Sequence, residues 1–201
     1  MSKEPICRVI SKEVLSEDWG VLSKVHFEVR RRSGEWQRLA RETYDRGNGA
    51  VCLLYNPETD CVLLTRQFRL PAFLNGGLEG LIEAPAGLLE GAEPAARMRA
   101  ELMEETGFAI EALTHLFDVY MSPGSVTEYL ACFQGIYTAA DQTGDGGGTY
   151  DEGEDIEVMH VPLRQAMQMI AQGEIRDGKT IILLQHLMIA QLTQGRAADF
   201  G

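Results

Sequence analysis

The chain has 201 residues, 45% of them hydrophobic and 24% charged, which is typical of globular proteins and excludes collagen-like, disordered and membrane-spanning chains. Its 18 basic and 30 acidic residues give a formal net charge of −12, which would repel a phosphate backbone, so we expect no nucleic-acid partner. The N-terminus lacks the apolar core of a signal peptide, and the four cysteines show no metal-site spacing. We therefore expect a cytoplasmic protein with no membrane partner.

The N-terminal region alternates short apolar and charged runs from Ile6 to about Tyr44. Ser33-Gly34 lies where a hairpin would turn, so these runs predict a small antiparallel sheet. Gly47-Asn48-Gly49 then interrupts the pattern. We expect an N-terminal antiparallel β region over residues 1–46 and a second domain over residues 47–201.

The second domain mixes strand and helix patterns, which is typical of an α/β or α+β fold. Pro94 suits a first helical position and Gly107 a C-cap, so about 13 residues between them should form a helix. Strands are expected over residues 50–55, 61–68, 116–121, 128–139 and 156–163. Two further helices are expected over residues 162–172 and 180–194.

A glycine- and aspartate-rich stretch covers residues 140–153 and is too polar to join a core. Loops of this length inside a compact domain are usually either functional lids or disordered segments. Both interpretations remain open at this point.

Three glutamates on the helix after Pro94 are candidate functional residues. Steps of three and four residues place Glu101 on the same helix face as Glu104 and Glu105. Like charges so close destabilise a helix unless water solvates them or a cation lies between them. Carboxylate oxygens are the ligands that Mg²⁺ prefers, so both a solvated acidic face and a cation site are open.

The stretch from Gly87 to Phe108 resembles the Nudix box, a family pattern written G-x5-E-x7-R-E-U-x-E-E-x-G-U with U apolar. Gly87, Glu93 and the three glutamates match it, although the spacer before Glu101 is one residue short. Ala100 stands where the box has an arginine. Because residues four apart on a helix face one another, Arg97 could supply that charge to Glu101.

The resemblance runs from about Leu15 to Leu183 and is strongest to the GDP-mannose pyrophosphatase branch of the Nudix hydrolases. The segments that carry it are RETYDRGNGA (41–50), TRQFR (65–69), YMSPGSVTE (120–128), EDIEV (154–158) and GEIRDGKT (173–180). That branch shares the short spacer and lacks the box arginine. The resemblance implies a Nudix α/β/α sandwich with a mixed sheet, preceded by a small N-terminal antiparallel β domain.

For the metal site, the resemblance implies that the Ala86 carbonyl, Glu101, Glu105 and Glu154 hold Mg²⁺, with Mn²⁺ as an alternative. Glu104 completes the acidic face. Glu154 lies in a loop that supplies a carboxylate to the attacking water in related nucleotide-sugar pyrophosphatases. Which carboxylate is the base stays open, because Glu152 and Glu157 are close in sequence.

For the substrate, the resemblance implies a Mg²⁺-dependent enzyme that hydrolyses GDP-mannose to GMP and mannose 1-phosphate. It places Arg69 and Lys179 on phosphate or sugar oxygens, with Gly87 and Leu88 nearby, and Glu128 on a sugar hydroxyl or metal-bound water. It also implies a homodimer in which the partner's N-terminal sheet grips the base. The residues of that sheet would be Trp19, Arg41 and Glu42.

Three other interpretations compete with this one. Residues 173–180 satisfy the P-loop pattern G-x4-G-K-[ST], but they follow a helix pattern rather than a strand, and Gly173 is better explained as a helix C-cap. Ala100 and the short spacer are compatible with a non-catalytic Nudix-fold nucleotide-binding protein. ADP-ribose or another ADP-sugar is the alternative substrate.

Overall fold

The structure is a computed structural model that describes residues 5–198, apart from the side chains of residues 152 and 194–198. The chain forms two compact units. One comprises the chain up to Asn48 together with Ser122–Tyr129, and the other comprises Gly49–Met121 together with the chain from Leu130 onward. In the part of the chain that is described, no helix is both long and apolar enough to cross a membrane.

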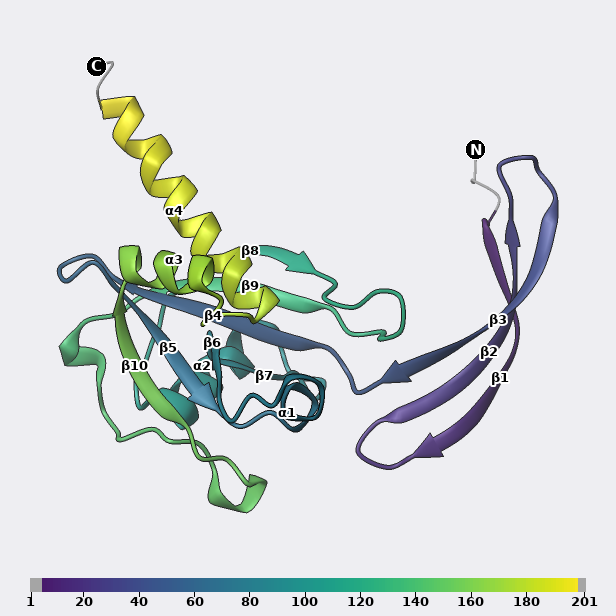
Figure 1. Cartoon of the computed structure of the whole chain (residues 1–201), viewed down its shortest axis with the longest axis horizontal. Coiled ribbons are helices and arrows are strands. Elements are labelled where there is room, and N and C mark those ends of the chain that lie inside the picture. Colours follow the sequence, from purple (N-terminus) through teal and green to yellow (C-terminus); the bar gives the residue numbers. More distant parts are fainter. Residues whose placement is uncertain (1–4, 199–201) are drawn as a thin grey trace. The chain divides into compact units, whose positions relative to one another are not determined.

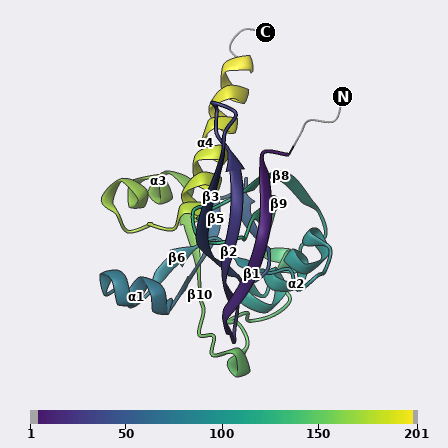
Figure 2. The same cartoon turned by 90° about the vertical axis from the view of Figure 1, so that its right-hand side faces the viewer.

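The first unit is built on a three-stranded antiparallel sheet in the order β1–β2–β3. Its strands are β1 (Cys7–Glu17), β2 (Val21–Arg30) and β3 (Trp36–Asp45), which lie side by side in Figure 2. Strand β1 is exposed along its whole length and carries exposed apolar side chains such as Val9 and Val14. The small antiparallel sheet expected at the N-terminus is confirmed.

The second unit contains a mixed sheet in the order β10–β5–β4–β9–β8, with β6 paired to β5 and β7 paired to β4. Strand β4 runs parallel to β9, whereas the other pairs are antiparallel. The strands are β4 (Gly49–Asn56), β5 (Cys61–Gln67), β6 (Leu81–Glu83), β7 (Ala86–Leu88), β8 (Leu113–Val119), β9 (Leu130–Ile136) and β10 (Glu157–Pro162).

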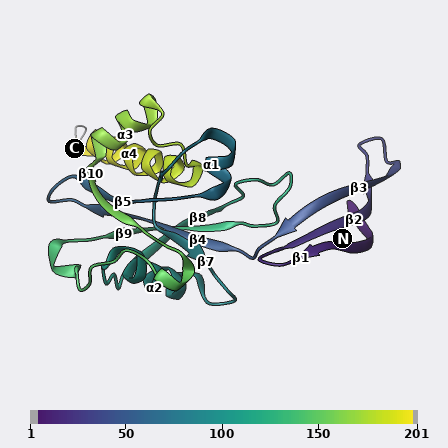
Figure 3. The ribbon, with the colours of Figure 1, turned by 60° about the horizontal axis from the view of Figure 1, so that its bottom comes forward.

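Helices cover both faces of the mixed sheet. Figures 1 and 3 show α3 (Leu163–Gln172) and α4 (Gly178–Ala198) on one face and α2 (Pro94–Thr106) on the other. A short helix, α1 (Leu70–Gly76), follows β5. This arrangement confirms the α/β/α sandwich with a mixed sheet.

The core lies between the central strands and the helices. Seven of the eight residues of β4 are buried, as expected for a central strand covered on both faces. Val51 of β4 and Leu64 of β5 belong to one apolar cluster with Leu183 and Leu184 of α4. Met98 and Leu102 of α2 are fully buried as well.

The sequence patterns miss α1, β6 and β7, because runs of three to seven residues are too short to show a periodicity. Helix α4 begins two residues before the expected Thr180. The Thr180 N–H donates to Asp177 Oδ2 at 3.0 Å, so Asp177 caps the helix and sets its start. Two short 3-10 helices, η1 (Ala139–Asp141) and η2 (Tyr150–Glu152), lie in the glycine-rich stretch and its flank.

Candidate active site

The ends of α2 are set by residues of the box pattern. Glu93 is the N-cap, and its carboxylate accepts from the N–H groups of Ala95 at 3.1 Å and Ala96 at 2.8 Å. These hydrogen bonds lower the pKa of Glu93 below its ordinary value. Gly107 ends the helix in the left-handed region with φ of 78°. The expected helix is confirmed, with Pro94 as its first residue and Gly107 directly after its last.

Glu101 lies directly over Gly87 of strand β7. A Cβ atom built on Gly87 would stand 1.9 Å from Glu101 Oε1 and 2.1 Å from its Cδ, distances that no real side chain tolerates. Glycine is therefore required at position 87 for the Glu101 carboxylate to reach this place. Glu101 itself is only 7% exposed.

Arg97 forms the ion pair with Glu101 that their i, i+4 spacing predicts. Its Nη2 lies 2.7 Å from Glu101 Oε1, its Nη1 lies 3.7 Å from Glu104 Oε2, and its Nε donates to the Leu88 carbonyl at 3.2 Å. One guanidinium thus joins α2 to β7 and holds the first box glutamate. The exposed Glu104 lies on the outer side of this arrangement, with a side chain 47% exposed.

Glu105 is the most deeply buried of the three glutamates, at 1% exposure. Its Oε2 has no hydrogen-bond partner among the described residues. Burial raises its pKa to about 8, and the charges of Glu101 and Glu154 act in the same direction. A buried carboxylate without a partner is costly for the folded state, so this oxygen is available to bind a cation.

The raised pKa of Glu105 predicts how the stability of the cation-free protein depends on pH. An unfolded chain would ionise this carboxyl near 4.5, whereas the folded protein ionises it near 8. Between these values the folded state binds the extra proton, so stability is lost as pH rises. In EDTA, we expect the melting temperature to fall more between pH 5 and 8.5 for the wild type than for Glu105→Gln. Parallel curves for the two proteins would contradict this prediction.

The glycine-rich stretch packs against the carboxyl end of α2. The Gly147 N–H donates to the Glu105 carbonyl at 2.9 Å, and the Gly148 N–H donates to the Glu104 carbonyl at 3.1 Å. Both glycines have positive φ values, 103° and 81°. This part of the stretch is therefore the cap of the carboxylate helix, a use that neither the lid nor the disorder interpretation included.

Glu154 is held by the same stretch. Its Oε2 accepts from the Thr149 N–H at 3.0 Å, and a Cβ atom on Gly148 would stand 2.6 Å from that oxygen. The charge of Glu154 contributes to the raised pKa of Glu105, so the two carboxylates lie within electrostatic range of each other. Glu157, in contrast, is exposed on β10 and pairs with Arg66 at 3.1 Å, while the side chain of Glu152 lies outside the description.

The carboxylates Glu101, Glu105 and Glu154 fit a divalent cation by the chemistry of their oxygens and by the partnerless Glu105 Oε2. Ala86, whose carbonyl would join them, is half-buried on β7 opposite Val51. Within the described residues, no three His, Cys, Asp or Glu side chains are already gathered as the ligand set of one ion. Glu101 and Glu154 both act electrostatically on Glu105, but the three carboxylates do not form a complete coordination sphere by themselves.

Arg69 and Lys179 meet on a buried carboxylate, that of Glu83, which is 4% exposed. Arg69 Nε donates to Glu83 Oε2 at 2.9 Å, and Lys179 Nζ donates to Glu83 Oε1 at 3.1 Å. Partial burial opposes the charged form of Arg69, but Glu83, Glu105 and Glu154 together raise the pKa of its guanidinium. Both cations therefore belong to the same unit as the carboxylate cluster.

The other predicted substrate residues lie in the first unit. Trp19 is 66% exposed, and the Arg46 guanidinium lies 5.5 Å from its ring centroid. Arg46 Nη2 also lies 2.8 Å from Glu128 Oε1 and 3.0 Å from Glu128 Oε2, so one arginine joins two predicted residues. Arg41 and Glu42 are exposed neighbours on β3 and point to opposite faces of the sheet.

Sequence reasoning misses Glu83 and Arg46, which each organise two predicted residues. Arg46 lies inside the segment RETYDRGNGA that carries the resemblance, and Glu83 lies four residues before Gly87, but neither residue shows a pattern of its own. A glutamate in the apolar run LIEAPAG was the available signal for Glu83, because a buried charge needs a partner. No comparable signal marks Arg46.

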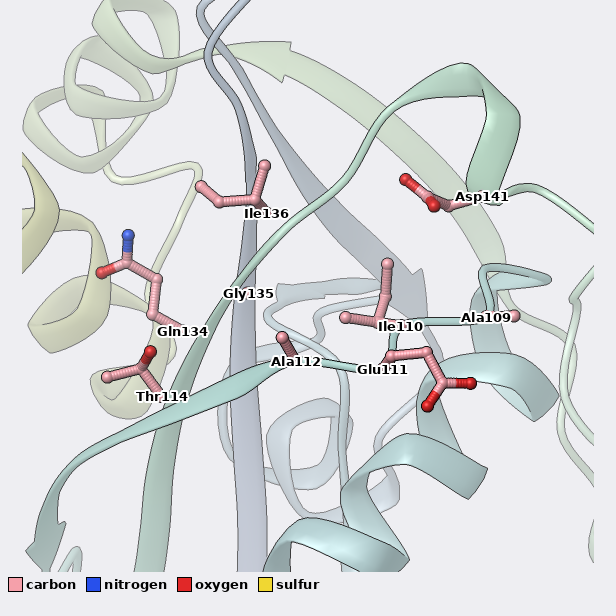
Figure 4. A pocket seen from close by; sticks show the side chains of 9 residues that line it. All are labelled: Ala109, Ile110, Glu111, Ala112, Thr114, Gln134, Gly135, Ile136 and Asp141. Atoms are coloured by element: carbon pink, nitrogen blue, oxygen red, sulfur yellow. The ribbon is translucent and has the colours of Figure 1, made fainter.

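An open depression of about 500 Å³ lies elsewhere, beside β8 and β9 (Figure 4). It is lined by none of the predicted site residues. Its Asp141 already accepts from the Thr138 N–H at 2.7 Å and from the Thr138 hydroxyl at 2.9 Å, so it serves a local turn. We do not place the active site there.

The P-loop alternative is excluded by the structure around Gly173. This glycine follows α3 as its C-cap, with φ of 75°, and its N–H donates to the Ile170 carbonyl. A P-loop follows a strand instead.

Comparisons with known proteins agree with these observations. The family described as "GDP-mannose pyrophosphatase NudK N-terminal domain" matches residues 7–44, and the family described as "NUDIX domain" matches residues 45–184. A protein of Klebsiella pneumoniae subsp. pneumoniae named "GDP-mannose pyrophosphatase" is 48% identical over 190 residues, covering 94% of this chain and 95% of that one. A protein of Enterobacter sp. with the same name is 48% identical over 185 residues, covering 92% and 96%.

Among solved structures, one described as "Crystal structure of ADP compounds hydrolase" superposes with a TM-score of 0.72. The match covers 98% of this chain and 100% of that one at 18% sequence identity. This likeness shows the shared fold.

Proposed function

The chain belongs to the Nudix family and is a Nudix hydrolase, and from this premise we propose that it cleaves GDP-mannose into GMP and mannose 1-phosphate. The observation that supports GDP-mannose as the substrate is the 48% identity, along 94% of this chain, to a protein named GDP-mannose pyrophosphatase. The similarity includes the N-terminal region, where the expected base-binding residues lie.

Nudix hydrolases generally use divalent metal ions, and we propose Mg²⁺ for this chain, with Mn²⁺ as a substitute. Glu101, Glu105, Glu154 and the Ala86 carbonyl would hold the metal, because hard cations take oxygen ligands. When bound, such cations neutralise the charge of a diphosphate and lower the pKa of water.

The remaining steps belong to the side chains of this protein. Arg69 offers the diphosphate a planar fork of N–H donors, and Lys179 offers a compact ammonium. Gly87 and Leu88 belong to strand β7, and Glu101 lies over this strand. The Glu154 carboxylate, which the Thr149 N–H holds at 3.0 Å, accepts a proton from the attacking water, a step typically worth about 10²–10⁴-fold.

We also propose that residues 1–46 form a domain and that the molecule is a homodimer joined through the sheet of this domain. Strand β1 supports this proposal, because an exposed edge strand with apolar side chains is suited to burial against a second chain. The large exposed apolar residues in and beside β1 are Ile6, Val9, Ile10, Val14 and Leu15. Trp19, Arg41 and Glu42 would then bind the base of a nucleotide in the partner's site, while Glu128 would bind the sugar. The cytoplasmic location stays a prediction from the sequence.

Trp19 provides a test of base binding. Because the exposed ring can stack on a base, we expect Trp19→Ala to raise KM roughly tenfold and to change kcat little. Trp36→Ala is the matched control, since Trp36 also lies on the N-terminal sheet with an arginine, Arg8, 4.0 Å from its ring centroid. Equal KM values for wild type and Trp19→Ala would exclude Trp19 from base binding.

The decisive assay for the proposed function measures GMP release from GDP-mannose with Mg²⁺, with Mn²⁺ and with EDTA, beside ADP-ribose and GTP. We expect metal-dependent formation of GMP and mannose 1-phosphate, with GDP-mannose preferred. Preference for ADP-ribose would indicate that the chain is an ADP-sugar pyrophosphatase instead. Binding of a nucleotide sugar without cleavage would indicate the non-catalytic alternative.

A further inference from the structure

Glu83 occupies a place that neither the box pattern nor the predicted site residues explain. It ends strand β6 with a carboxylate whose side chain is 5% exposed. Its Oε2 receives Arg69 Nε at 2.9 Å and Arg69 Nη2 at 2.8 Å, and its Oε1 receives Lys179 Nζ at 3.1 Å. The two oxygens are thus divided between two cations that come from distant parts of the sequence.

Both cations are more exposed than the carboxylate that they share. The Arg69 side chain is 39% exposed and that of Lys179 is 11% exposed, against 5% for Glu83. Glu83 binds the Nε–Nη2 edge of the guanidinium, and because the group is planar, its Nη1 edge faces away from the carboxylate. The carboxylate therefore orients the donors that a ligand would meet.

A second set of contacts prevents Glu83 and Lys179 from moving apart. The Ala84 N–H donates to the hydroxyl of Thr180 at 2.6 Å, and that hydroxyl donates to Asp177 Oδ2 at 2.6 Å. Asp177 Oδ1 in turn lies 3.0 Å from Lys179 Nζ. Since Thr180 is fully buried, the end of β6 and the start of α4 are joined by more than the ion pair alone.

The charges of the cluster cancel. Arg69 and Lys179 contribute two positive charges, and Glu83 and Asp177 contribute two negative ones. The pair therefore presents directed hydrogen-bond donors instead of net positive charge. If Glu83 only neutralised charge, removing its charge would strengthen the binding of an anion; if it orients the donors, the same change would weaken it.

We propose that Glu83 is a positioning residue. It holds Arg69 and Lys179 together so that the two cationic side chains form one binding site for the diphosphate of the substrate. This inference rests on the proposed function, which supplies the diphosphate. It assigns to Glu83 no contact with substrate. The carboxylate acts only through the two cations that it holds.

The test combines Glu83→Gln with Arg69→Ala in a double-mutant cycle, read by calorimetric binding of inorganic pyrophosphate in the presence of Mg²⁺. We expect Glu83→Gln to weaken binding roughly tenfold or more in the wild-type background, because it loses a charged hydrogen-bonding partner of both cations. The loss should become much smaller once Arg69 is alanine. Glu58→Gln, at an exposed position in the turn between β4 and β5, removes the same charge and should leave binding unchanged.

Unchanged or tighter pyrophosphate binding by Glu83→Gln would overturn the proposal, as would an equal loss in both backgrounds, which indicates a general effect on the fold. If Glu83→Gln does not fold, Glu83→Asp keeps the charge on a chain one carbon shorter, which cannot reach both cations. That variant should bind pyrophosphate more weakly, and wild-type affinity would overturn the proposal. Because pyrophosphate binding needs no cleavage, this result is separate from whether the wild type hydrolyses GDP-mannose.

Discussion

Glu105→Gln is expected to reduce kcat by about a thousandfold or more, which corresponds to ~4 kcal/mol of activation free energy. The substitution keeps the shape of the side chain but removes the charge of the only one of the three α2 glutamates with a buried, partnerless oxygen. In our proposal this oxygen binds the cation that neutralises the diphosphate. Steady-state kinetics at saturating Mg²⁺ measure the loss.

The fold of Glu105→Gln should be retained, because the neutral side chain resembles the protonated acid that the buried site favours. Melting curves in EDTA would show this directly. Glu58→Gln is the matched control and should keep wild-type activity, since its exposed side chain lies in the turn between β4 and β5 and belongs to none of the predicted site residues. Near-normal turnover by a well-folded Glu105→Gln would exclude Glu105 from the metal site.

Gly87→Ala is expected to lower kcat/KM by roughly a hundredfold, or ~3 kcal/mol, with little change in melting temperature. The added methyl would stand 1.9 Å from Glu101 Oε1, so this carboxylate must leave its place. The atom that must move is the end of a flexible side chain, and the Gly87 backbone has no positive φ, so alanine adds no backbone strain. The cost should therefore fall on catalysis and only slightly on folding.

Gly76→Ala provides the matched control for this prediction. A Cβ atom on Gly76 would find its nearest neighbour, Leu78 Cγ, at 4.0 Å, which is an ordinary contact. The kinetics of Gly76→Ala should equal those of the wild type. If Gly87→Ala were equally active, the Glu101 carboxylate would not need its observed position, and its assignment as a ligand would fail.

The glycine-rich stretch shows why a local pattern was ambiguous. Its composition is too polar for a core, and that much was visible in the sequence. Its role depends on Gly147 and Gly148 donating to carbonyls of α2, which lies more than thirty residues earlier in the chain. Such pairing depends on the tertiary structure. A glycine permits a backbone conformation with positive φ, but it does not specify which residues that backbone will contact.

Local sequence patterns predict the antiparallel N-terminal sheet, the limits of α2 and the carboxylates on one helix face. These features depend on local rules: strand alternation, a proline at N1, a glycine C-cap and the i, i+4 spacing. Arg97 could be paired with Glu101 for the same reason, and the structure shows this ion pair at 2.7 Å.

The ion pairs between distant segments, in contrast, could be identified only in the folded chain. Arg69 precedes α1, Glu83 ends β6 and Lys179 lies in α4, and no periodicity relates the three residues. The partnerless oxygen of Glu105 likewise depends on what surrounds it in space. A short-range pattern constrains the conformation of neighbouring residues, whereas burial and electrostatics depend on all the atoms that the fold brings together, and for that reason Glu83 became visible only in the folded chain.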